Sequence, residues 1–439
     1  GSGGVRAARM AAMAGAKVAI TEQVQVGGTC VLRGCVPKKL LVYASHFHED
    51  FEDAAGYGWS VPKPSFDWAT LIANKDKEID RLNAAYKSTL ARAKAELIES
   101  RATLVDRNTI AVAGRQVSAE VILIATGSWP ELPKIPGIEH AITSNECFHL
   151  DKLPERVVVV GGGYIALEFA GIFNGLGSDT TVLYRGEQVL RGFDMDVRNF
   201  LADELGKKGI KIRCKTDVAR IDKQGGALRL TLKDGATLEC DQVLYATGRR
   251  PLTRNMGLDK VGVQLDEIGA VKVDARSQTS VPNIYAVGDC TNRINLTPVA
   301  IREGHAFADS VFGKTPWQVD HADCPSAVFT QPPVGSVGLS EEAARAKFGA
   351  IDIYRESFRP MKHTMTGRTE RALMKLIVDR KSQVVVGAHM VGSDAPEIIQ
   401  TLAIAVKLKA TKQQIDQTIA VHPTAAEEFV TMRTPVAAE

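Results

Sequence analysis

The stretch from Arg156 to Leu167 reads RVVVVGGGYIAL, and it decides the fold of this chain. Its first five residues form a short β-branched run, which is typical of a buried parallel strand. The run passes into G-x-G-x-x-A at Gly161–Ala166 and then into an apolar helical pattern, and a second strand is expected at Thr180–Tyr184. This order predicts a dinucleotide-binding unit, in which glycines admit a pyrophosphate to the helix N-terminus.

A second copy of this plan opens the chain. The sequence GSGG at positions 1–4 leads into an alanine-rich helix expected at Val5–Ala14, and a strand expected at Lys17–Thr21 ends at Glu22. The first strand of such a unit would precede this glycine turn, so we expect the natural chain to begin earlier. The alternative is a Gly-Ser cloning remnant, which the helix and the correctly spaced acidic residue disfavour.

Both copies close in the same way. The sequence VILIATG at 121–127 matches VLYATG at 243–248, and both are hydrophobic strands that end on Ala-Thr-Gly. One glycine fingerprint is weak evidence, whereas two copies with matching ends predict two bound dinucleotides. The expected fold class is therefore α/β, with two Rossmann-like domains.

The residues that end the second strands distinguish the two dinucleotides. Glu22 can accept hydrogen bonds from ribose hydroxyls, which suits FAD or NAD. Arg185 stands at nearly the same position in the other copy, with Arg191 beyond it, and two guanidiniums suit the 2′-phosphate of NADPH. The alternative is that both arginines are solvated surface charges.

A close cysteine pair follows the first unit. The sequence GGTCVLRGCVPKK at 27–39 places Cys30 and Cys35 five positions apart, and one helical turn brings such positions near disulfide range. A helix N-terminus and the nearby Lys38 and Lys39 would lower a thiol pKa. The alternatives are a zinc half-site, for which no other cysteine supplies the second half, and two unlinked buried cysteines. We interpret the pair as a redox-active disulfide.

The composition limits the class of function. With 439 residues, the chain is long enough for two to four domains. A net charge of +3 without a dense Lys/Arg run gives no case for nucleic acid or membrane as the main partner. No apolar run approaches the ~20 residues of a membrane helix. Seven scattered cysteines are unlike a secreted disulfide framework, so we expect a cytoplasmic protein.

The cysteine motif, the two dinucleotide units and HPTAAEE at 422–428 together resemble the pyridine nucleotide–disulfide oxidoreductases over the whole chain. Within that family, the chain is most similar to the members that reduce glutathione disulfide. The resemblance implies the cofactors NADPH and FAD and a C-terminal α+β dimerisation domain. It divides the chain into an FAD-binding domain at 1–129, an NADPH-binding domain at 130–252, a central part completing the FAD domain at 253–322, and an interface domain at 323–439.

The resemblance also implies roles for single residues. Asp289 would bind the ribityl chain, Lys38 would pair with Glu168 near flavin N5, and Tyr164 would cover the flavin ring; the alternatives are a surface ion pair and a packed aromatic. The expected FAD contacts are Gly1, Ser2, Gly3, Gly4, Glu22, Gly28, Thr29, Cys30, Lys38, Ala102, Thr126, Gly127, Asp289 and Thr297. The expected NADPH contacts are Gly161, Gly163, Tyr164, Ile165, Glu168, Arg185, Arg191 and Gly248. No metal site is expected.

A histidine near the C-terminus is the expected proton donor. Histidine has a suitable pKa and a carboxylate can hold its tautomer, so His422 with Glu427 suits protonation of a leaving thiolate. On its own, a histidine in a loop is usually a surface residue. The family implies that His422 completes the site of the other subunit in a homodimer, with Cys30 attacking substrate and Cys35 facing the flavin. The interface domain is expected to hold strands at 372–378 and 384–390 and a helix at 395–408.

The expected substrate is glutathione disulfide, an anion. Arg6 and Arg9 lie on the first helix, where the family contacts substrate, and arginine favours an anion. Tyr86 matches a family tyrosine that lines the glutathione site, and His422 would also contact substrate. The acidic residues with which trypanothione reductases bind a cationic substrate are not present in this region. Departures from the family pattern are His305, where vertebrate-type members have an arginine, together with Glu78 and Ala85.

Other reductases of the family fit less well. Dihydrolipoamide dehydrogenase would prefer NAD and carry an acid at the position of Arg185. Large thioredoxin reductases and mercuric reductase need C-terminal cysteines, and none follows Cys324. A non-catalytic dinucleotide-binding redox sensor is the alternative from another class, but a sensor needs no leaving-group acid.

Overall fold

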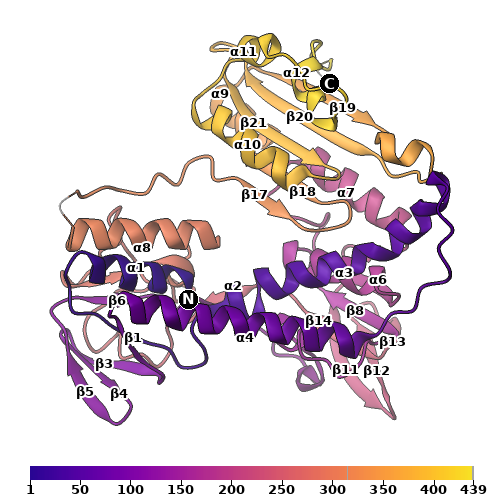
Figure 1. Ribbon diagram of the computed structural model, residues 1–439. Helices are drawn as coiled ribbons and strands as arrows, with labels where there is room; N and C mark the ends of the chain where they lie inside the picture. Colours follow the sequence, from indigo (N-terminus) through magenta and orange to yellow (C-terminus); the bar gives the residue numbers. More distant parts are fainter. Residues whose placement is uncertain (314, 438–439) are drawn as a thin grey trace.

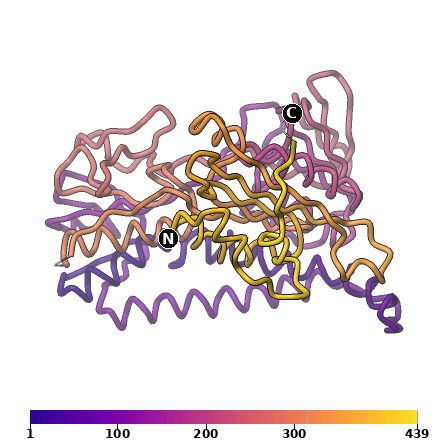
Figure 2. Tube along the Cα trace, turned by 90° about the horizontal axis from the view of Figure 1, so that it is seen from above, coloured from indigo at the N-terminus to yellow at the C-terminus, as the bar shows by residue number. Residues whose placement is uncertain are grey.

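The computed structural model describes residues 1–313 and 315–437. Figure 1 shows three parts: one around α1 and α8, one around α6 and β8, and a C-terminal part above both. In Figure 2, seen from above, the C-terminal part lies over the middle of the molecule. None of the helices in the described ranges has the length and apolar character that crossing a membrane requires.

The second dinucleotide unit is built on a four-stranded parallel sheet in the order β10-β9-β8-β14. Strand β8 spans Arg156–Val160 and β9 spans Asp179–Leu183, so both predicted strands are confirmed. Helix α6 spans Tyr164–Gly175 and begins directly after the glycine turn. The other elements are α7 (Met195–Lys207), β10 (Lys211–Arg213), β11 (Val218–Gln224), β12 (Ala227–Leu232), β13 (Thr237–Cys240) and β14 (Gln242–Tyr245).

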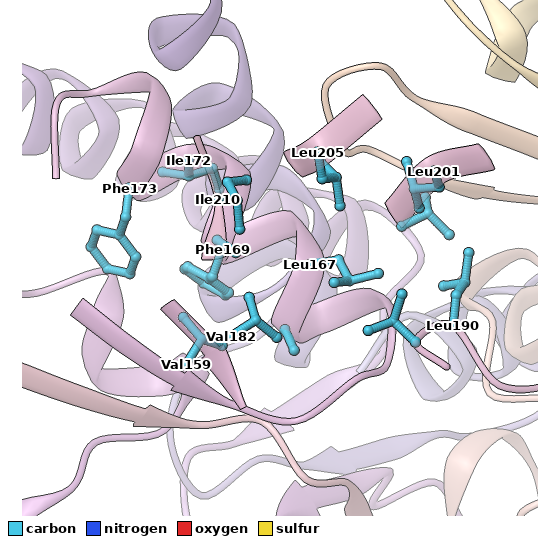
Figure 3. Close-up of a cluster of buried hydrophobic side chains, with 14 of the residues drawn as sticks. Val159, Leu167, Phe169, Ile172, Phe173, Val182, Leu190, Leu201, Leu205 and Ile210 are labelled. Carbon is cyan, nitrogen blue, oxygen red and sulfur yellow. The ribbon is translucent and has the colours of Figure 1, made fainter. Parts of the chain in front are cut away.

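The continuous apolar run of β8 reflects a strand that is covered on both faces. Val157 and Val159 join the core under α6 and α7, whereas Val158 and Val160 join the core against the antiparallel sheet β11-β12-β13. Figure 3 shows Val159 beside Phe169 of α6 in the first of these cores. Each fully buried valine contributes about 1.5–3 kcal/mol, so the run stabilises this unit substantially.

The first unit contains α1 (Ser2–Met13) and two parallel strand pairs, β1-β2 and β6-β16. Strand β1 spans Ala19–Thr21, two residues shorter than predicted, because its partner β2 (Glu96–Ile98) pairs with only three residues. Strand β16 (Ile284–Ala286) pairs with β6 (Ile122–Ile124), so the chain returns to this unit after residue 252. Helix α8 (Thr297–Val311) packs on α1, and β3 (Ala102–Asp106), β4 (Thr109–Val112) and β5 (Arg115–Ser118) form a separate antiparallel sheet.

Two strands and several helices connect the units. Strand β7 (Ser128–Pro130) pairs antiparallel with β15 (Arg249–Pro251), which links the two Ala-Thr-Gly ends. The helices are α2 (Gly28–Arg33), α3 (Cys35–Ala54), η1 (Ala55–Tyr57), α4 (Trp68–Arg92), η2 (Ile138–His140), α5 (Ser144–Cys147) and η3 (Gly288–Thr291).

The C-terminal part is a five-stranded antiparallel sheet in the order β17-β18-β21-β20-β19. Strands β20 (Ala372–Asp379) and β21 (Val385–Val391) and helix α10 (Ala395–Lys407) confirm the three elements predicted here. The remaining elements are β17 (Ser326–Val328), β18 (Val334–Gly338), α9 (Glu341–Phe348), β19 (Ile351–Phe358), η4 (Met361–Thr364), α11 (Lys412–Gln417), η5 (Ala425–Glu427) and α12 (Glu428–Thr431).

Candidate active site

The two cysteines lie on two consecutive helices rather than on one. Cys30 is on α2, and Cys35 is the first residue of α3, which is 20 residues long. The break falls at Gly34, where a Cβ would lie 2.6 Å from the carbonyl oxygen of Thr29, so a side chain cannot fit. Cys35 therefore sits at the N-terminus of a long helix, where unpaired N–H groups favour a negative charge.

The two thiols have opposite pKa shifts. Both are free thiols in this structure, which corresponds to the reduced state. A hydrogen bond from Cys30, aided by Thr297 and by the charge of Lys38, lowers the pKa of Cys35 to about 6. The same hydrogen bond, together with burial, raises the pKa of Cys30 well above its ordinary value. The reduced pair thus holds a thiolate on Cys35 and a proton on Cys30.

Helix α8 begins beside this thiolate. Cys35 Sγ lies 3.8 Å from Oγ1 of Thr297, the first residue of α8. No side chain caps this helix. The N-terminus of α3 and the Thr297 hydroxyl therefore both favour the thiolate of Cys35.

A buried ion pair joins α3, the helix that begins at Cys35, to the second unit. Lys38 Nζ donates to Glu168 Oε1 at 2.7 Å, and both side chains are at most 10% exposed. The same oxygen accepts the backbone N–H of Phe329 at 2.9 Å. The Nζ atoms of Lys38 and Lys39 lie 4.0 and 3.7 Å from the centroid of the Phe329 ring, where a cation is stabilised. The ion pair with Glu168 fixes the ammonium group of Lys38 near Cys30 and Cys35.

An arginine that the sequence did not single out lies on the other side of the cysteines. Arg249 begins β15 and donates to the carbonyl oxygen of Ser128 at 2.7 Å and to its Oγ at 2.8 Å. Ser128 Oγ in turn donates to Asp289 Oδ2 at 2.7 Å. Burial lowers the pKa of Arg249, and the charges of Asp289, Tyr164 and Cys35 oppose that shift. Arg249 therefore orders the loop of Asp289 and adds a cation near the thiolate.

The first unit offers what the FAD pyrophosphate and ribose need. No side chain caps α1, and Ser2 Oγ at its first turn is buried without a hydrogen-bond partner among the described residues. Such unpaired groups at a helix N-terminus fit a pyrophosphate. Glu22 lies just after β1 and Asp289 lies on η3. These residues fit the cofactor, and Gly1, Gly3, Gly4, Gly28, Thr29, Ala102, Thr126 and Gly127 lie on or beside α1, α2, β3 and β6.

The second unit has the geometry of a dinucleotide turn. Gly161 has a φ of 141°, and a Cβ there would lie 2.4 Å from the carbonyl oxygen of Ala246. Gly163 precedes α6, whose N-terminus has no side-chain cap, and Tyr164 at the first position is 44% exposed. Arg185 and Arg191 lie in the exposed loop after β9, and no carboxylate of the described residues pairs with either. The residues thus fit a dinucleotide with a 2′-phosphate; Ile165 is partly buried and Gly248 follows β14.

The expected substrate residues lie on α1 and α4 beside the cysteine helix. Tyr86 packs against apolar side chains of both α1 and α2. The Nε of Arg9 is buried without a hydrogen-bond partner in the described part of the chain, and neither Arg6 nor Arg9 pairs with a carboxylate there. His305 is one of the departures from the family pattern. Its Nε2 lies 3.5 Å from Oδ2 of Asp309, a carboxylate of the same helix.

His422 does not meet the cysteines of its own chain. Its Nδ1 lies 3.0 and 3.1 Å from the two carboxylate oxygens of Glu427, and its side chain is 78% exposed. The segment that carries it lies in the C-terminal part, away from α2 (Figure 1). Two exposed apolar residues, Ile419 and Val421, precede it. The imidazole of His422 is thus exposed and oriented by the carboxylate of Glu427.

The sequence pattern of one family covers almost all of this chain. The family described as pyridine nucleotide-disulphide oxidoreductase matches residues 1–304, and its dimerisation domain matches residues 324–433. The chain belongs to the pyridine nucleotide-disulphide oxidoreductases. The first match ends within α8, and the second begins just before β17.

Individual pyridine nucleotide-disulphide oxidoreductases are similar over nearly the full length. Glutathione reductase of Burkholderia cepacia is 54% identical over 99% of this chain and 96% of its own length. Glutathione reductase of Nostoc sp. is 50% identical over 99% of this chain and 97% of its own length. Trypanothione reductase of Trypanosoma congolense is 42% identical over 93% of this chain and 87% of its own length.

Two residues of this disulphide oxidoreductase site were missed from the sequence. Arg249 directly follows an Ala-Thr-Gly end, so a charged residue at that point was a usable signal. Phe329 carried no signal, because its contact with Lys38 and Glu168 joins positions more than 160 residues apart.

Proposed function

We propose that the chain reduces glutathione disulfide to two molecules of glutathione, with NADPH as the reductant and FAD as the carrier. The observation that carries this proposal is the pair Cys30 and Cys35 where α2 meets α3, beside the buried Lys38–Glu168 ion pair and between two dinucleotide-binding units. The high identity to glutathione reductases over nearly the full chain supports the substrate.

The residues at the flavin side hold charge and geometry. Bound NADPH would supply a hydride, and bound FAD would pass its two electrons to the Cys30–Cys35 disulfide. Lys38, fixed by Glu168, keeps a positive charge next to the thiolate that this reduction produces. Tyr164, the first residue of α6, would cover bound flavin and give way to bound nicotinamide.

The disulfide exchange uses the two cysteines in turn. Cys30 Sγ attacks one sulfur of glutathione disulfide, so a mixed disulfide forms and the substrate S–S bond breaks. His422 accepts the proton of Cys30 and gives it to the first leaving thiolate. The Cys35 thiolate then attacks Cys30 Sγ, which re-forms the Cys30–Cys35 disulfide and releases the second glutathione thiolate; this thiolate takes a proton from solvent.

The substrate side is arranged for an anion. Arg6 and Arg9 supply positive charge without a carboxylate partner in the described residues, and Tyr86 lines the same side of α2. Glutathione disulfide carries free carboxylates that these guanidiniums can bind in a bidentate manner. This charge pattern favours glutathione disulfide over a cationic disulfide such as trypanothione.

A homodimer would complete the site. The dimerisation domain of the family matches residues 324–433, and His422 and Glu427 lie within it. Exposed apolar side chains support a partner surface, namely Ile404 on α10, Leu408 directly after it, and Tyr43, Phe47 and Phe51 on α3. We propose that His422 of each chain acts on the cysteines of the other. The scattered cysteines suit a reducing compartment, so we place the enzyme in the cytoplasm.

The test compares NADPH oxidation by the FAD-loaded protein with glutathione disulfide, trypanothione disulfide, lipoamide and thioredoxin as substrates. We expect turnover with glutathione disulfide to exceed that with the other three. Failure to turn over glutathione disulfide would refute the proposal. The Cys30→Ser variant should lose turnover, yet NADPH should still bleach its flavin.

A further inference from the structure

The loop that carries Arg185 and Arg191 is held by a third arginine. Arg198 lies in the first turns of α7, and its Nε donates to the carbonyl oxygen of Val189 at 2.8 Å. Its Nη2 donates to the carbonyl oxygen of Gln188 at 2.6 Å. Two consecutive carbonyls thus accept from one edge of a rigid, planar guanidinium. This arrangement fixes the two peptide planes that lie between the phosphate-binding arginines.

The loop has no regular secondary structure, although Val189 and Leu190 are buried in the core with α6 and α7. Residues 184–194 contain no helix or strand. Leu190 has a φ of 56°, a left-handed conformation that is uncommon for a residue with a side chain and persists only where the surroundings impose it. The N–H of Leu190 donates to the carbonyl oxygen of Gly162 at 2.6 Å, which ties the loop to the dinucleotide turn.

Helix α7 is a firm support for Arg198. Its N-cap, Asp194, is fully buried and accepts the backbone N–H of Glu341 at 2.9 Å. Lys375 on β20 donates to both carboxylate oxygens of Asp194, at 2.9 and 3.0 Å. The helix that positions the loop is therefore anchored to the C-terminal sheet, and a site built on fixed elements is more precise than one on a free loop.

The charges around the loop favour a phosphate. No carboxylate of the described residues pairs with Arg198, and the same holds for Arg185 and Arg191. Glu187, the exposed acid of the loop, forms an ion pair with Lys215 at 2.7 Å. The ribose 2′ group of a dinucleotide lies near the end of the second strand of such a unit, where this loop begins.

We propose that Arg198 is a positioning residue for the 2′-phosphate, and that it sets the preference for NADPH over NADH through the carbonyls of Gln188 and Val189. The proposal rests on the use of NADPH that is proposed above. It does not require Arg198 to touch the cofactor, because its two donors on one edge already hold the loop.

The test measures binding of 2′,5′-ADP and of 5′-AMP to the FAD-loaded protein by calorimetry, so that no disulfide turnover is needed. In Arg198→Gln we expect affinity for 2′,5′-ADP to fall about tenfold, since loss of hydrogen bonds to a charged donor costs roughly this much. Affinity for 5′-AMP should stay within about twofold, because the glycine turn and α6 hold that phosphate. Arg198→Lys should not restore 2′,5′-ADP binding, since one ammonium cannot hold two consecutive carbonyls in fixed orientation.

The control is Lys223→Gln, which removes one exposed positive charge from the same unit and should change neither affinity. An equal loss for both nucleotides in Arg198→Gln would overturn the proposal, because it would show a general defect. Full recovery in Arg198→Lys would also overturn it, in favour of long-range charge alone. If the unaltered protein bound 5′-AMP as tightly as 2′,5′-ADP, the proposed use of NADPH would fail instead.

Discussion

The opposite pKa shifts of Cys30 and Cys35 lead to a prediction that can be tested without turnover. In the reduced protein the pKa of Cys35 is lowered from 9.0 to about 6, and that of Cys30 is raised. At pH 7, a thiol with a pKa of 6 is about 90% thiolate, whereas one with a pKa of 9 is about 1% thiolate. We therefore expect iodoacetamide to alkylate Cys35 faster than Cys30 wherever both are equally accessible.

The sign of the pH dependence follows from the lowered pKa. Alkylation of Cys35 should rise with pH through a midpoint near 6 and reach a plateau well below the ordinary thiol value. Thr297→Val removes one hydrogen bond, at 3.8 Å, without changing side-chain size. A net hydrogen bond of about 0.5–1.5 kcal/mol corresponds to a rise of the midpoint by roughly 0.5–1 pH unit. Cys30→Ala removes the largest cause of the shift and should raise the midpoint further.

The assay is the pH profile of alkylation, with the modified peptide identified by mass spectrometry. Thr89→Val is the matched control, because Thr89 lies half-buried on α4, where its hydroxyl donates only within its own helix. This change should leave the midpoint of Cys35 unmoved. A midpoint near 9, or preferential labelling of Cys30 near pH 7, would refute the reasoning.

Three further predictions concern NADPH binding, the dimer and a buried ion pair. The double variant Arg185→Ala, Arg191→Ala should raise KM for NADPH at least tenfold and leave KM for NADH nearly unchanged, as measured by steady-state kinetics. An equal rise in the two KM values would contradict the 2′-phosphate assignment. His422→Gln should lower kcat by about 10²–10⁴-fold, while flavin reduction by NADPH stays fast. A mixed dimer of His422→Gln and Cys30→Ser chains should regain activity at one site. An inactive mixed dimer would argue against a shared site. Glu303→Ala removes a buried carboxylate that accepts from Arg293 at 2.8 Å. Thermal unfolding should therefore show that the free energy of unfolding falls by about 3 kcal/mol. An unchanged Tm would contradict a stabilising role for this ion pair.

Much of the fold could be predicted because its signals are local. The run Arg156–Val160 and the glycines after it lie within one strand, one turn and one helix, and the structure confirms each. The ends of a strand are harder to predict. Strand β1 proved shorter than predicted, because the length of its partner β2 decides how many residues pair. The break at Gly34 was also unforeseen, since it depends on the approach of the Thr29 carbonyl.

The site was predictable where each residue carries its own chemistry. Cys30, Cys35 and His422 have reactive groups, and their neighbours in sequence indicated their use. The contacts that tune them were not predictable, because they join distant segments. Thr297 reaches Cys35 across 262 positions, and no local pattern in either segment indicates that pairing.

The helix that carries Cys35 lies within the first unit in sequence, but its packing places it at the junction of all three parts. Its N-terminal turn is fixed to α6 by the bond from Lys38 to Glu168. Further along, Gly175 at the end of α6 lies so close that a Cβ there would be 2.4 Å from the carbonyl oxygen of Ser45. Ser45 Oγ also accepts from Gln331 Nε2 at 2.6 Å, which ties the same turn to the C-terminal part. Movement of the second unit would therefore displace α3 as well, so the position of Cys35 relative to α6 is set by packing between parts of the chain.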